Sequence, residues 1–284
     1  MRILVTGATG FIGNHVIDHL LQKGHEIIAT SAHVDKAKQF PWYNQVRYIQ
    51  FDLSAFHKGE NYFAFFEKPD KMLHLAWEGL PRYKEDFHLK KNLPGHYLFL
   101  SNLIENGLND LTVAGTCLEY GMQEGCLKET DPAMPLFAYP SAKNQLRMML
   151  EKLSTEFQFN LKWVRLFYMY GKGQNPNSLL SQLDRAIEQG DEEFNMSEGE
   201  QVRDYLPVEK VAEYLSAITL NQNFTGIVNC CSNEPVRLKD FVADYLKHKN
   251  SQIKINFGYY SYNDYEPMRF WGDNSRLLSI LKNE

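Results

Sequence analysis

Three glycines, each three positions after the last, stand near the start of the chain in the sequence ILVTGATGFIGN (residues 3–14). The apolar run before them predicts a strand, and the apolar segment after them predicts a helix. Gly7 permits a tight reversal after the strand, Gly10 lets the backbone approach a pyrophosphate, and Gly13 lets the helix pack against the sheet. The N–H groups at the start of that helix favour phosphate. This strand–turn–helix therefore predicts a dinucleotide-binding domain.

Short β-branched runs alternate with longer segments of helical periodicity along the chain, a pattern typical of a parallel sheet wrapped by helices. The predicted strands are Arg2–Thr6, His25–Thr30, Val46–Gln50, Lys71–Leu75, Asp110–Ala114, Leu161–Leu166 and Gly226–Cys230. The predicted helices are Phe11–Lys23, His88–Asn106, Ser141–Glu156, Leu179–Gln189 and Val208–Leu220. We therefore expect an α/β fold, a Rossmann-type doubly wound parallel sheet with a smaller C-terminal substrate-binding lobe.

The composition changes after residue 170. Residues 171–202 are polar and rich in Gly, Asn, Gln and Glu, and residues 189–202 and 256–273 read as loops. We predict an NAD(P)-binding Rossmann domain at 1–170 that also takes in roughly 203–232. The remainder of 171–284 forms a substrate-binding lobe interleaved with it. Ligands of such folds bind at the carboxyl ends of the strands, where we expect this lobe to lie.

Charge and composition exclude several classes of protein. The formal net charge is −5, from 35 acidic residues against 30 Lys and Arg, so we expect no nucleic-acid partner. The longest apolar runs are too short to span a membrane, and we expect no membrane partner. The N-terminus does not read as a signal peptide, which predicts a cytoplasmic protein. Four cysteines and nine histidines show no metal-ligand spacing, so no metal is expected.

The GxxGxxG spacing, with Thr9 before its second glycine and Phe11 and Ile12 after it, resembles the extended short-chain dehydrogenase/reductase family of sugar-nucleotide epimerases, dehydratases and reductases. Further matches follow in the family's order: an Asp-Leu pair that contacts adenine, a His-Leu-Ala segment beside the cofactor, and a helix asparagine that steadies the active site. The resemblance implies an NAD(P) site formed by Gly7, Thr9, Gly10, Phe11, Ile12, Gly13, Asp52, Leu53, Leu75, Ala76 and Asn92.

The end of the second predicted strand bears on the choice of cofactor. An acidic residue at this place would bind the ribose hydroxyls of NAD and repel a 2′-phosphate. The sequence ATSAH (residues 29–33) has no acid there, and Ser31 and His33 are candidates to contact a 2′-phosphate, with Lys36 nearby. We therefore predict NADP(H) in preference to NAD(H).

A tyrosine and a lysine four residues apart, Tyr139 and Lys143, lie on one face of a predicted helix. The lysine charge is expected to lower the pKa of the tyrosine, which can then exchange a proton with a sugar oxygen while the nicotinamide moves a hydride. The resemblance implies that Thr116, at the end of the preceding strand, orients the reacting oxygen. It also implies that Lys143 holds the nicotinamide ribose. We expect Thr116, Tyr139 and Lys143 to be the catalytic residues.

The surroundings of Thr116 narrow the reaction. Family dehydratases carry two acids directly after this threonine, where this chain has Cys117 and Leu118. Glu119 follows, but alternation along an extended segment would turn it to the side of Cys117. The double epimerase-reductases of the family use a Cys and a His, and alignment puts Leu118 and Gly173 at those places. Of the reactions known in the family, oxidation or reduction at a single carbon is the one that these positions leave open.

Three interpretations stay open. The first is a 4-ketoreductase that uses NAD(P)H to reduce a nucleotide-linked 4-keto-6-deoxyhexose. The missing acid and the stretch AWEGLP (residues 76–81) favour it, because that stretch resembles 4-ketoreductases of surface-glycan (O-antigen) synthesis. The second is a nucleotide-sugar 4-epimerase with tightly bound NAD. The third is a non-catalytic NADP-sensing regulator, which the intact Tyr139 and Lys143 argue against.

The resemblance also implies contacts with the nucleotide-sugar substrate. Arg203 opens a motif, RDY, whose arginine binds the substrate diphosphate, and a guanidinium suits phosphate oxygens. The predicted substrate-binding residues are Trp77, Thr116, Gln174, Asn175, Asn177, Arg203 and Arg269. An apolar stripe on the helix after Tyr139 fits either core packing or a homodimer interface, and the family pattern predicts the homodimer.

Overall fold

The computed structural model describes residues 1–262 and 266–282, and this part of the chain contains a seven-stranded sheet in the order β11-β7-β5-β4-β1-β2-β3. All neighbouring strands of the sheet are parallel. They are β1 (Arg2–Thr6), β2 (Glu26–Ser31), β3 (Arg47–Gln50), β4 (Lys71–His74), β5 (Asp110–Thr116), β7 (Asn160–Leu166) and β11 (Gly226–Cys230). The chain winds outward from β1 in both directions, which confirms the Rossmann-type fold predicted from the sequence.

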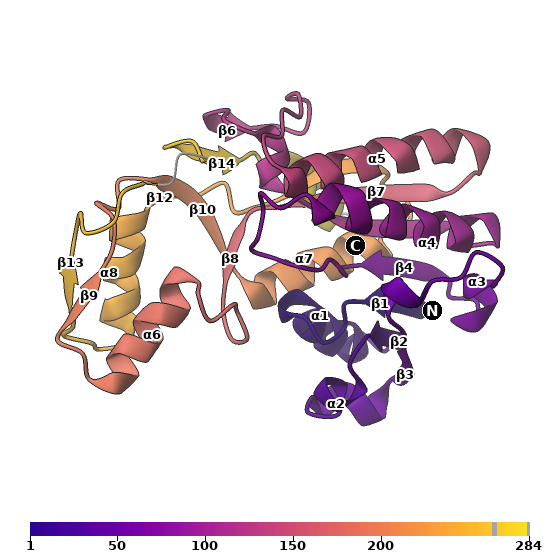
Figure 1. The fold of residues 1–284 in the computed structure, drawn as a ribbon, viewed down its shortest axis with the longest axis horizontal. Helices are drawn as coiled ribbons and strands as arrows, with labels where there is room; N and C mark the ends of the chain where they lie inside the picture. Colours follow the sequence, from indigo (N-terminus) through magenta and orange to yellow (C-terminus); the bar gives the residue numbers. More distant parts are fainter. Residues whose placement is uncertain (263–265, 283–284) are drawn as a thin grey trace.

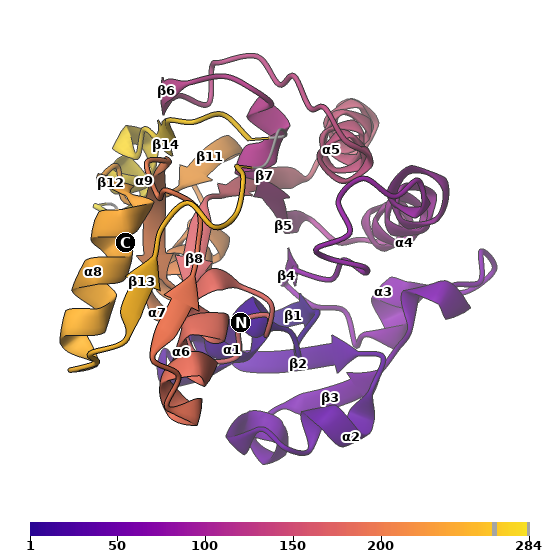
Figure 2. The same cartoon turned by 60° about the vertical axis from the view of Figure 1, so that its left-hand side comes forward.

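Helices cover both faces of this sheet (Figures 1 and 2). One face packs against α1 (Phe11–Gln22), α7 (Val208–Leu220) and α9 (Ser275–Leu281). The other packs against α3 (Tyr62–Phe65), α4 (Leu93–Glu105) and α5 (Ala138–Glu156). Apolar side chains at helical spacing turn inward from each helix, as Val16, Ile17 and Leu20 do on α1. Two apolar layers result, and they hold the strand ends in a fixed register.

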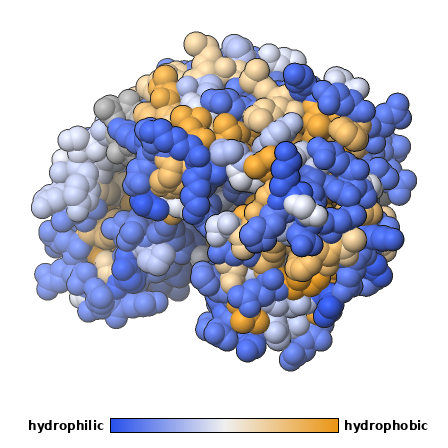
Figure 3. All heavy atoms as spheres, turned by 45° about the vertical axis from the view of Figure 1, so that its right-hand side comes forward, coloured by the Kyte–Doolittle hydropathy of each residue, from blue (hydrophilic) through white to orange (hydrophobic). Residues whose placement is uncertain are grey.

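The smaller lobe lies beside the carboxyl ends of the strands, on the left of Figure 1. Its elements are β8 (Tyr168–Tyr170), α6 (Leu179–Gln189), β9 (Glu193–Asn195), β10 (Val202–Pro207), β12 (Pro235–Arg237), α8 (Leu238–His248) and β13 (Lys254–Asn256). A small separate core unites α6 with α8 through Leu180, Leu183, Met196 and Val242. Figure 3 shows the surface indented between this lobe and the main body.

Some element boundaries differ from the sequence predictions. Helix α5 starts at Ala138 instead of Ser141, because Pro140 fits the first turn of a helix, where its missing N–H is not needed. Helix α8 and the short strand β9 were not predicted. Strand β9 pairs with β13, and a further short strand, β14 (Phe270–Gly272), pairs with β6 (Gly125–Leu127). Two segments expected to be loops are thus partly extended.

The end of the described chain returns to the large domain. Helix α9 places Leu277 and Ile280 in the same apolar layer as α1 and α7. The two parts are therefore interleaved further along the chain than residue 232. Within the described residues, no helix is both long and apolar enough to cross a membrane.

Candidate active site

The glycine turn after β1 leaves room that a side chain would fill. Gly7 has a φ of +68°, and a Cβ built there would lie 2.8 Å from the backbone nitrogen of Ala76. A Cβ on Gly13 would lie 2.3 Å from the carbonyl oxygen of Gly7. Gly10 begins α1 without a side-chain cap, so the first N–H groups of the helix are available to a phosphate. The turn, which also carries Thr9, Phe11 and Ile12, fits the pyrophosphate of a dinucleotide.

The end of β2 carries a pair of hydroxyl groups in place of an acid. Ser31 Oγ lies 2.9 Å from the hydroxyl of Tyr48, which donates to the Ser31 carbonyl oxygen at 3.0 Å. Tyr48 on β3 was not identified from the sequence. His33 is exposed at the start of the short helix α2 (Val34–Ala37). Asp52, just before Leu53, accepts hydrogen bonds from Ser54 that lower the pKa of its carboxyl group.

The segment after β4 faces the glycine turn. The backbone N–H of Ala76, next to Leu75, donates to Thr6 Oγ1 at 3.3 Å. Asn92 is buried in a turn that leads into α4, and its Nδ2 donates to the carbonyl oxygen of Glu78 at 3.0 Å. Asn92 therefore ties helix α4 to the loop that follows Ala76. That Asn92 also steadies the active site, as the resemblance implies, stays a prediction.

Thr116, Tyr139 and Lys143 come together at the carboxyl end of the sheet. Thr116 ends β5, Tyr139 lies in the first turn of α5, and Lys143 lies one turn later. The Tyr139 hydroxyl interacts with the Thr116 side chain. All three residues are buried, and the backbone N–H of Tyr139 donates to the carbonyl oxygen of Tyr83 at 2.9 Å. The geometry fits an acid/base tyrosine held beside a threonine hydroxyl and a lysine.

The protonation behaviour of this trio differs from the prediction. Burial raises the pKa of Tyr139 well above its usual value, whereas we expected Lys143 to lower it. Burial also lowers the pKa of Lys143 to about 7, and the charge of Glu119 opposes that fall. The Lys143 ammonium lies 4.4 Å from the centre of the Trp77 ring. Desolvation is the largest effect on both groups, and the raised pKa of Tyr139 corresponds to a neutral phenol that can donate a proton.

An aromatic wall made by Trp77, His88 and His96 borders the trio, and the two histidines were missed in the sequence. Trp77 Nε1 donates to His88 Nδ1 at 3.0 Å, so the other ring nitrogen of His88 carries the proton and donates to the Arg82 carbonyl oxygen. The Trp77 ring stacks on His96 with centroids 4.5 Å apart. The four-residue spacing of His88, Asn92 and His96 is a signal that would have placed them on one face.

The prediction for Glu119 assumed an extended segment, which the structure does not have. Residues Cys117–Tyr120 form a 3₁₀ turn instead of an extended segment, and the turn directs Glu119 beneath Thr116. There it is completely buried and interacts with Arg165 across 2.9 Å. The prediction was wrong because the alternation of side chains applies only to extended backbone.

The two predicted substrate arginines lie in different surroundings. Arg203 is buried, and its guanidinium donates to Glu266 at 3.0 Å and to the Val202 carbonyl oxygen at 2.9 Å. The ring of Phe270 lies 4.6 Å from the guanidinium carbon. Arg269 is exposed, and its carbonyl oxygen accepts a hydrogen bond from the N–H of Gly125. Contact of either side chain with a diphosphate stays a prediction.

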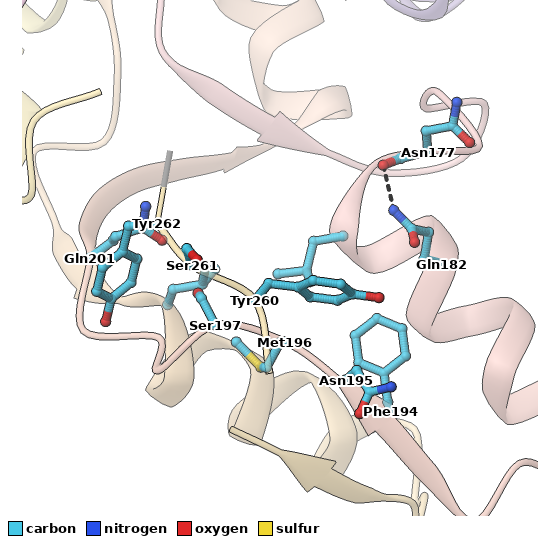
Figure 4. Close-up of a pocket in the computed structure, with 12 residues that line it drawn as sticks. Asn177, Gln182, Phe194, Asn195, Met196, Ser197, Gln201, Tyr260, Ser261 and Tyr262 are labelled. Carbon is cyan, nitrogen blue, oxygen red and sulfur yellow. Dashed lines mark hydrogen bonds between the residues drawn. The ribbon is translucent and has the colours of Figure 1, made fainter. Parts of the chain in front are cut away.

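A cavity of about 300 Å³ opens in the smaller lobe between α6, β9 and residues 260–262 (Figure 4). It is lined by Asn177, Leu179, Gln182, Phe194, Asn195, Met196, Ser197, Gln201, Leu238, Tyr260, Ser261 and Tyr262. Of the predicted substrate residues, Asn177 lines this cavity, and its carbonyl oxygen accepts a hydrogen bond from Gln182 Nε2. Gln174 instead donates to the Met169 carbonyl oxygen, and Asn175 accepts from the Asn177 N–H.

No cluster of three or more His, Cys, Asp or Glu side chains suited to a metal ion occurs among residues 1–262 and 266–282. The four cysteines are all unpaired thiols in this structure.

Comparison with known families decides the affiliation of the chain. The model of the NAD dependent epimerase/dehydratase family matches residues 3–231. The chain belongs to this family. The match extends from the glycine turn through Thr116, Tyr139 and Lys143 to the end of β11, and it takes in β8, α6, β9 and β10 of the smaller lobe. The resemblance inferred from the sequence motifs is thereby confirmed.

Curated relatives of this chain include two named as nucleotide-sugar dehydrogenases. A dTDP-6-deoxy-L-talose 4-dehydrogenase (NAD(+)) of Aggregatibacter actinomycetemcomitans is 30% identical over 273 residues, 96% of this chain and 99% of that protein. A GDP-6-deoxy-D-talose 4-dehydrogenase of the same species is 25% identical and covers 100% of this chain and 92% of its own length.

Solved structures share the fold of this chain. A UDP-glucuronic acid 4-epimerase from Bacillus cereus, in complex with UDP-glucuronic acid and NAD, matches with a TM-score of 0.82 at 20% identity. The match covers 100% of this chain and 94% of that one. The smaller lobe is therefore part of the shared architecture.

Proposed function

We propose that this protein reduces a nucleotide-linked 4-keto-6-deoxyhexose at C4, with hydride from a nicotinamide and a proton from Tyr139. The observation that carries the proposal is the meeting of Thr116, Tyr139 and Lys143 at the carboxyl end of the sheet, the same end at which the glycine turn follows β1. The family membership and the two dehydrogenase relatives support chemistry at C4 of a nucleotide sugar. The product would be a nucleotide deoxysugar for surface glycans such as O-antigen.

Each residue of the trio has a distinct part in this reaction. Thr116 Oγ1 holds the carbonyl oxygen at C4, and Tyr139 donates its proton to that oxygen as the alkoxide forms. Lys143 binds the nicotinamide ribose and stabilises the tyrosinate left behind. The bound nicotinamide supplies the hydride. Because burial raises the pKa of Tyr139, the phenol holds its proton before reaction.

The cofactor is best assigned as NAD(H). The preference for NADP(H) predicted from the missing acid is not supported by the relatives, since one is named for NAD(+) and the matching solved structure contains NAD. The paired hydroxyls of Ser31 and Tyr48 offer a ribose neutral hydrogen-bonding groups. Thermal unfolding with NADH or NADPH tests this choice, and a larger rise in melting temperature with NADPH would reverse it.

The cavity in the smaller lobe is proposed to take the nucleoside of the substrate. Asn177, Gln182 and Asn195 bring side-chain amides, which can both donate to and accept from a base. The rings of Phe194 and Tyr260 offer surfaces for stacking. The sugar would then extend towards the trio across the indentation between the lobe and the main body.

The experiment follows the oxidation of NADH or NADPH with a panel of dTDP-, GDP-, CDP- and UDP-linked 4-keto-6-deoxy sugars. Stoichiometric oxidation that depends on Tyr139 is expected. Absence of net oxidation, with a C4-inverted sugar detected by NMR from ordinary nucleotide hexoses, would instead identify a 4-epimerase. A Tyr139→Phe variant that kept full biological function would favour the non-catalytic regulator.

A further inference from the structure

Glu119 is a completely buried carboxylate directly behind the catalytic trio. Its Oε1 accepts hydrogen bonds from the backbone N–H of Thr116 and from Trp163 Nε1, both at 3.0 Å. Its Oε2 accepts a hydrogen bond from Arg165 Nε at 2.9 Å. A Cβ on Gly115 would lie 2.7 Å from Glu119 Oε1, so this arrangement needs a glycine beside it. The carboxylate is thus built into the site with every contact satisfied.

The contact with Thr116 bears on the orientation of the catalytic hydroxyl. Glu119 and Thr116 form a reciprocal cap: the Thr116 side chain accepts from the N–H of Leu118 at 3.2 Å, and Glu119 accepts from the N–H of Thr116. The two bonds fix the backbone at the end of β5. They also occupy one lone pair of the Thr116 hydroxyl, which restricts the directions left for its remaining contacts.

Trp163 connects Glu119 to Lys143. The Lys143 ammonium lies between two indole rings, 4.4 Å from the centre of Trp77 and 5.5 Å from that of Trp163. The N–H of Trp163 donates to Glu119 while its ring faces the ammonium. Hydrogen bonding to an anion increases the electron density of the ring, which strengthens its attraction for a cation.

The other titratable groups near Lys143 do not supply a negative charge. His74 on β4 and His96 on α4 both feel the charge of Lys143, and burial lowers the pKa of each, that of His96 to about 3. Tyr139, on the same helix as Lys143, remains a neutral phenol because burial raises its pKa. Glu119 is the anion that opposes the loss of the Lys143 proton.

We propose that Glu119 is a positioning residue, which orients Thr116 and keeps Lys143 positively charged without touching substrate or cofactor. Burial of a carboxylate–guanidinium pair seldom stabilises a fold relative to apolar side chains of similar size, so a role beyond stability accounts for its presence. The kinetic consequence rests on the proposed function, but the charge of Lys143 can be measured without any substrate.

The test is a pH titration of Lys143 by NMR in the full-length protein labelled with ¹³C-lysine, with the signal assigned from its loss in Lys143→Met. In Glu119→Gln we expect the titration midpoint of Lys143 to fall by on the order of one pH unit. Glu119→Asp keeps the charge and is expected to restore part of the shift. An unchanged midpoint in folded Glu119→Gln would overturn the proposal.

Asp110→Asn is the matched control. Asp110 is a buried carboxylate at the opposite end of β5, where Lys71 and Lys162 pair with it. Its loss disturbs the fold in a comparable way but leaves the midpoint of Lys143 in place. An equal shift in Asp110→Asn would show that the effect is not specific to Glu119 and would overturn the proposal.

Folding of the variants is checked by circular dichroism. If Glu119→Gln does not fold, the double variant Glu119→Gln/Arg165→Met removes both charges and is read in the same way. Failure of both to fold would assign Glu119 to the fold alone and overturn the proposal.

In kinetics, the alkaline limb of kcat/KM is expected to move to lower pH in Glu119→Gln. A wild type inactive on every nucleotide sugar would count against the proposed function, while the titration still decides the role of Glu119.

Discussion

Burial changes the chemistry of individual side chains at this site. Tyr139 and Lys143 both lie out of water, so each is pushed towards its neutral form, the phenol and the amine. A phenol that keeps its proton suits donation to a ketone. The lysine retains a charge only with help from its neighbours, and Glu119 provides that help.

Replacement of Tyr139 by Phe is expected to lower kcat by roughly 10²–10⁴-fold, the range for loss of a general acid. The ring remains to pack against Trp77, so affinity for the cofactor should change little. Steady-state kinetics and calorimetric titration with NADH measure the two effects. Tyr62→Phe is the control and should keep full activity. It removes a phenol on α3 that accepts a hydrogen bond from the N–H of His57. Comparable losses in both variants would contradict the assignment.

His96 should make the protein less stable in acid. Its folded-state pKa is about 3 and its ordinary value is 6.5, so between these values the unfolded chain binds one more proton. The contribution of neutral His96 to the free energy of unfolding is fully present above pH 6.5. It falls by about 2 kcal/mol when the pH is lowered to about 5. Urea unfolding at several pH values should show that the free energy of unfolding of His96→Gln depends less steeply on pH than that of the wild type. The exposed His57→Gln variant should follow the wild type, and an unaltered slope in His96→Gln would refute the prediction.

At the scale of single elements, strand β5 carries a different charge cluster at each end. Asp110 at its start bonds Lys71 and Lys162, and Thr116 at its end adjoins Glu119. All seven residues of β5, the two ends included, are buried. A strand held at both ends by buried ionic groups is a rigid support for Thr116, the threonine proposed to bind the substrate oxygen.

Two helical glycines should respond in opposite directions to alanine. In Gly13→Ala the new Cβ would meet the carbonyl oxygen of Gly7 at 2.3 Å, which forces the turn open, so cofactor binding should be lost and stability should fall by about 1–3 kcal/mol. In Gly95→Ala on α4 nothing lies within 4 Å, and stability should rise by about 0.5–1 kcal/mol. Urea unfolding and calorimetry with NADH separate the two. Retained binding in Gly13→Ala would argue against the phosphate site.

The whole molecule joins a rigid sheet to a lobe with its own small core, and the surface between them is indented (Figure 3). Thr116 lies on the sheet and Tyr139 and Lys143 on α5 of the main body, whereas the cavity of about 300 Å³ belongs to the lobe. A substrate that reaches both would bridge the two parts. This arrangement suits an elongated molecule such as a nucleotide sugar.

The predicted homodimer is tested at this scale. Leu98 on α4 and Met148 on α5 are 42% and 55% exposed on helices that pack side by side, which leaves apolar surface for a second copy. Light scattering should give twice the chain mass of 33.0 kDa, and Leu98→Glu with Met148→Glu should give the monomer. Phe257→Glu, at an exposed position on the lobe, is the control. A wild-type protein that is monomeric in solution would contradict the predicted homodimer.

The sequence predicted the features that depend on residues close together in the chain. Gly7, Gly10 and Gly13 were placed in a turn between a strand and a helix, and Tyr139 and Lys143 on one helix face after a strand, from their spacing together with the elements around them. The alternation of strands and helices likewise predicted the sheet, because each element shows its own period. Helix α8 was missed although Leu238, Phe241, Val242 and Tyr245 recur at helical spacing and pack in the core of the lobe, so the signal was present in the sequence.

Only the tertiary structure decided which groups surround the catalytic trio. Trp163 and Arg165 reach Glu119 from another strand, and the stacking of His96 on Trp77 depends on how α4 packs. Contacts of this kind bring together residues far apart in the chain, and they set burial, which in turn sets the pKa of Tyr139 and of Lys143. Local patterns therefore determined which residues can react, and packing decided their protonation state.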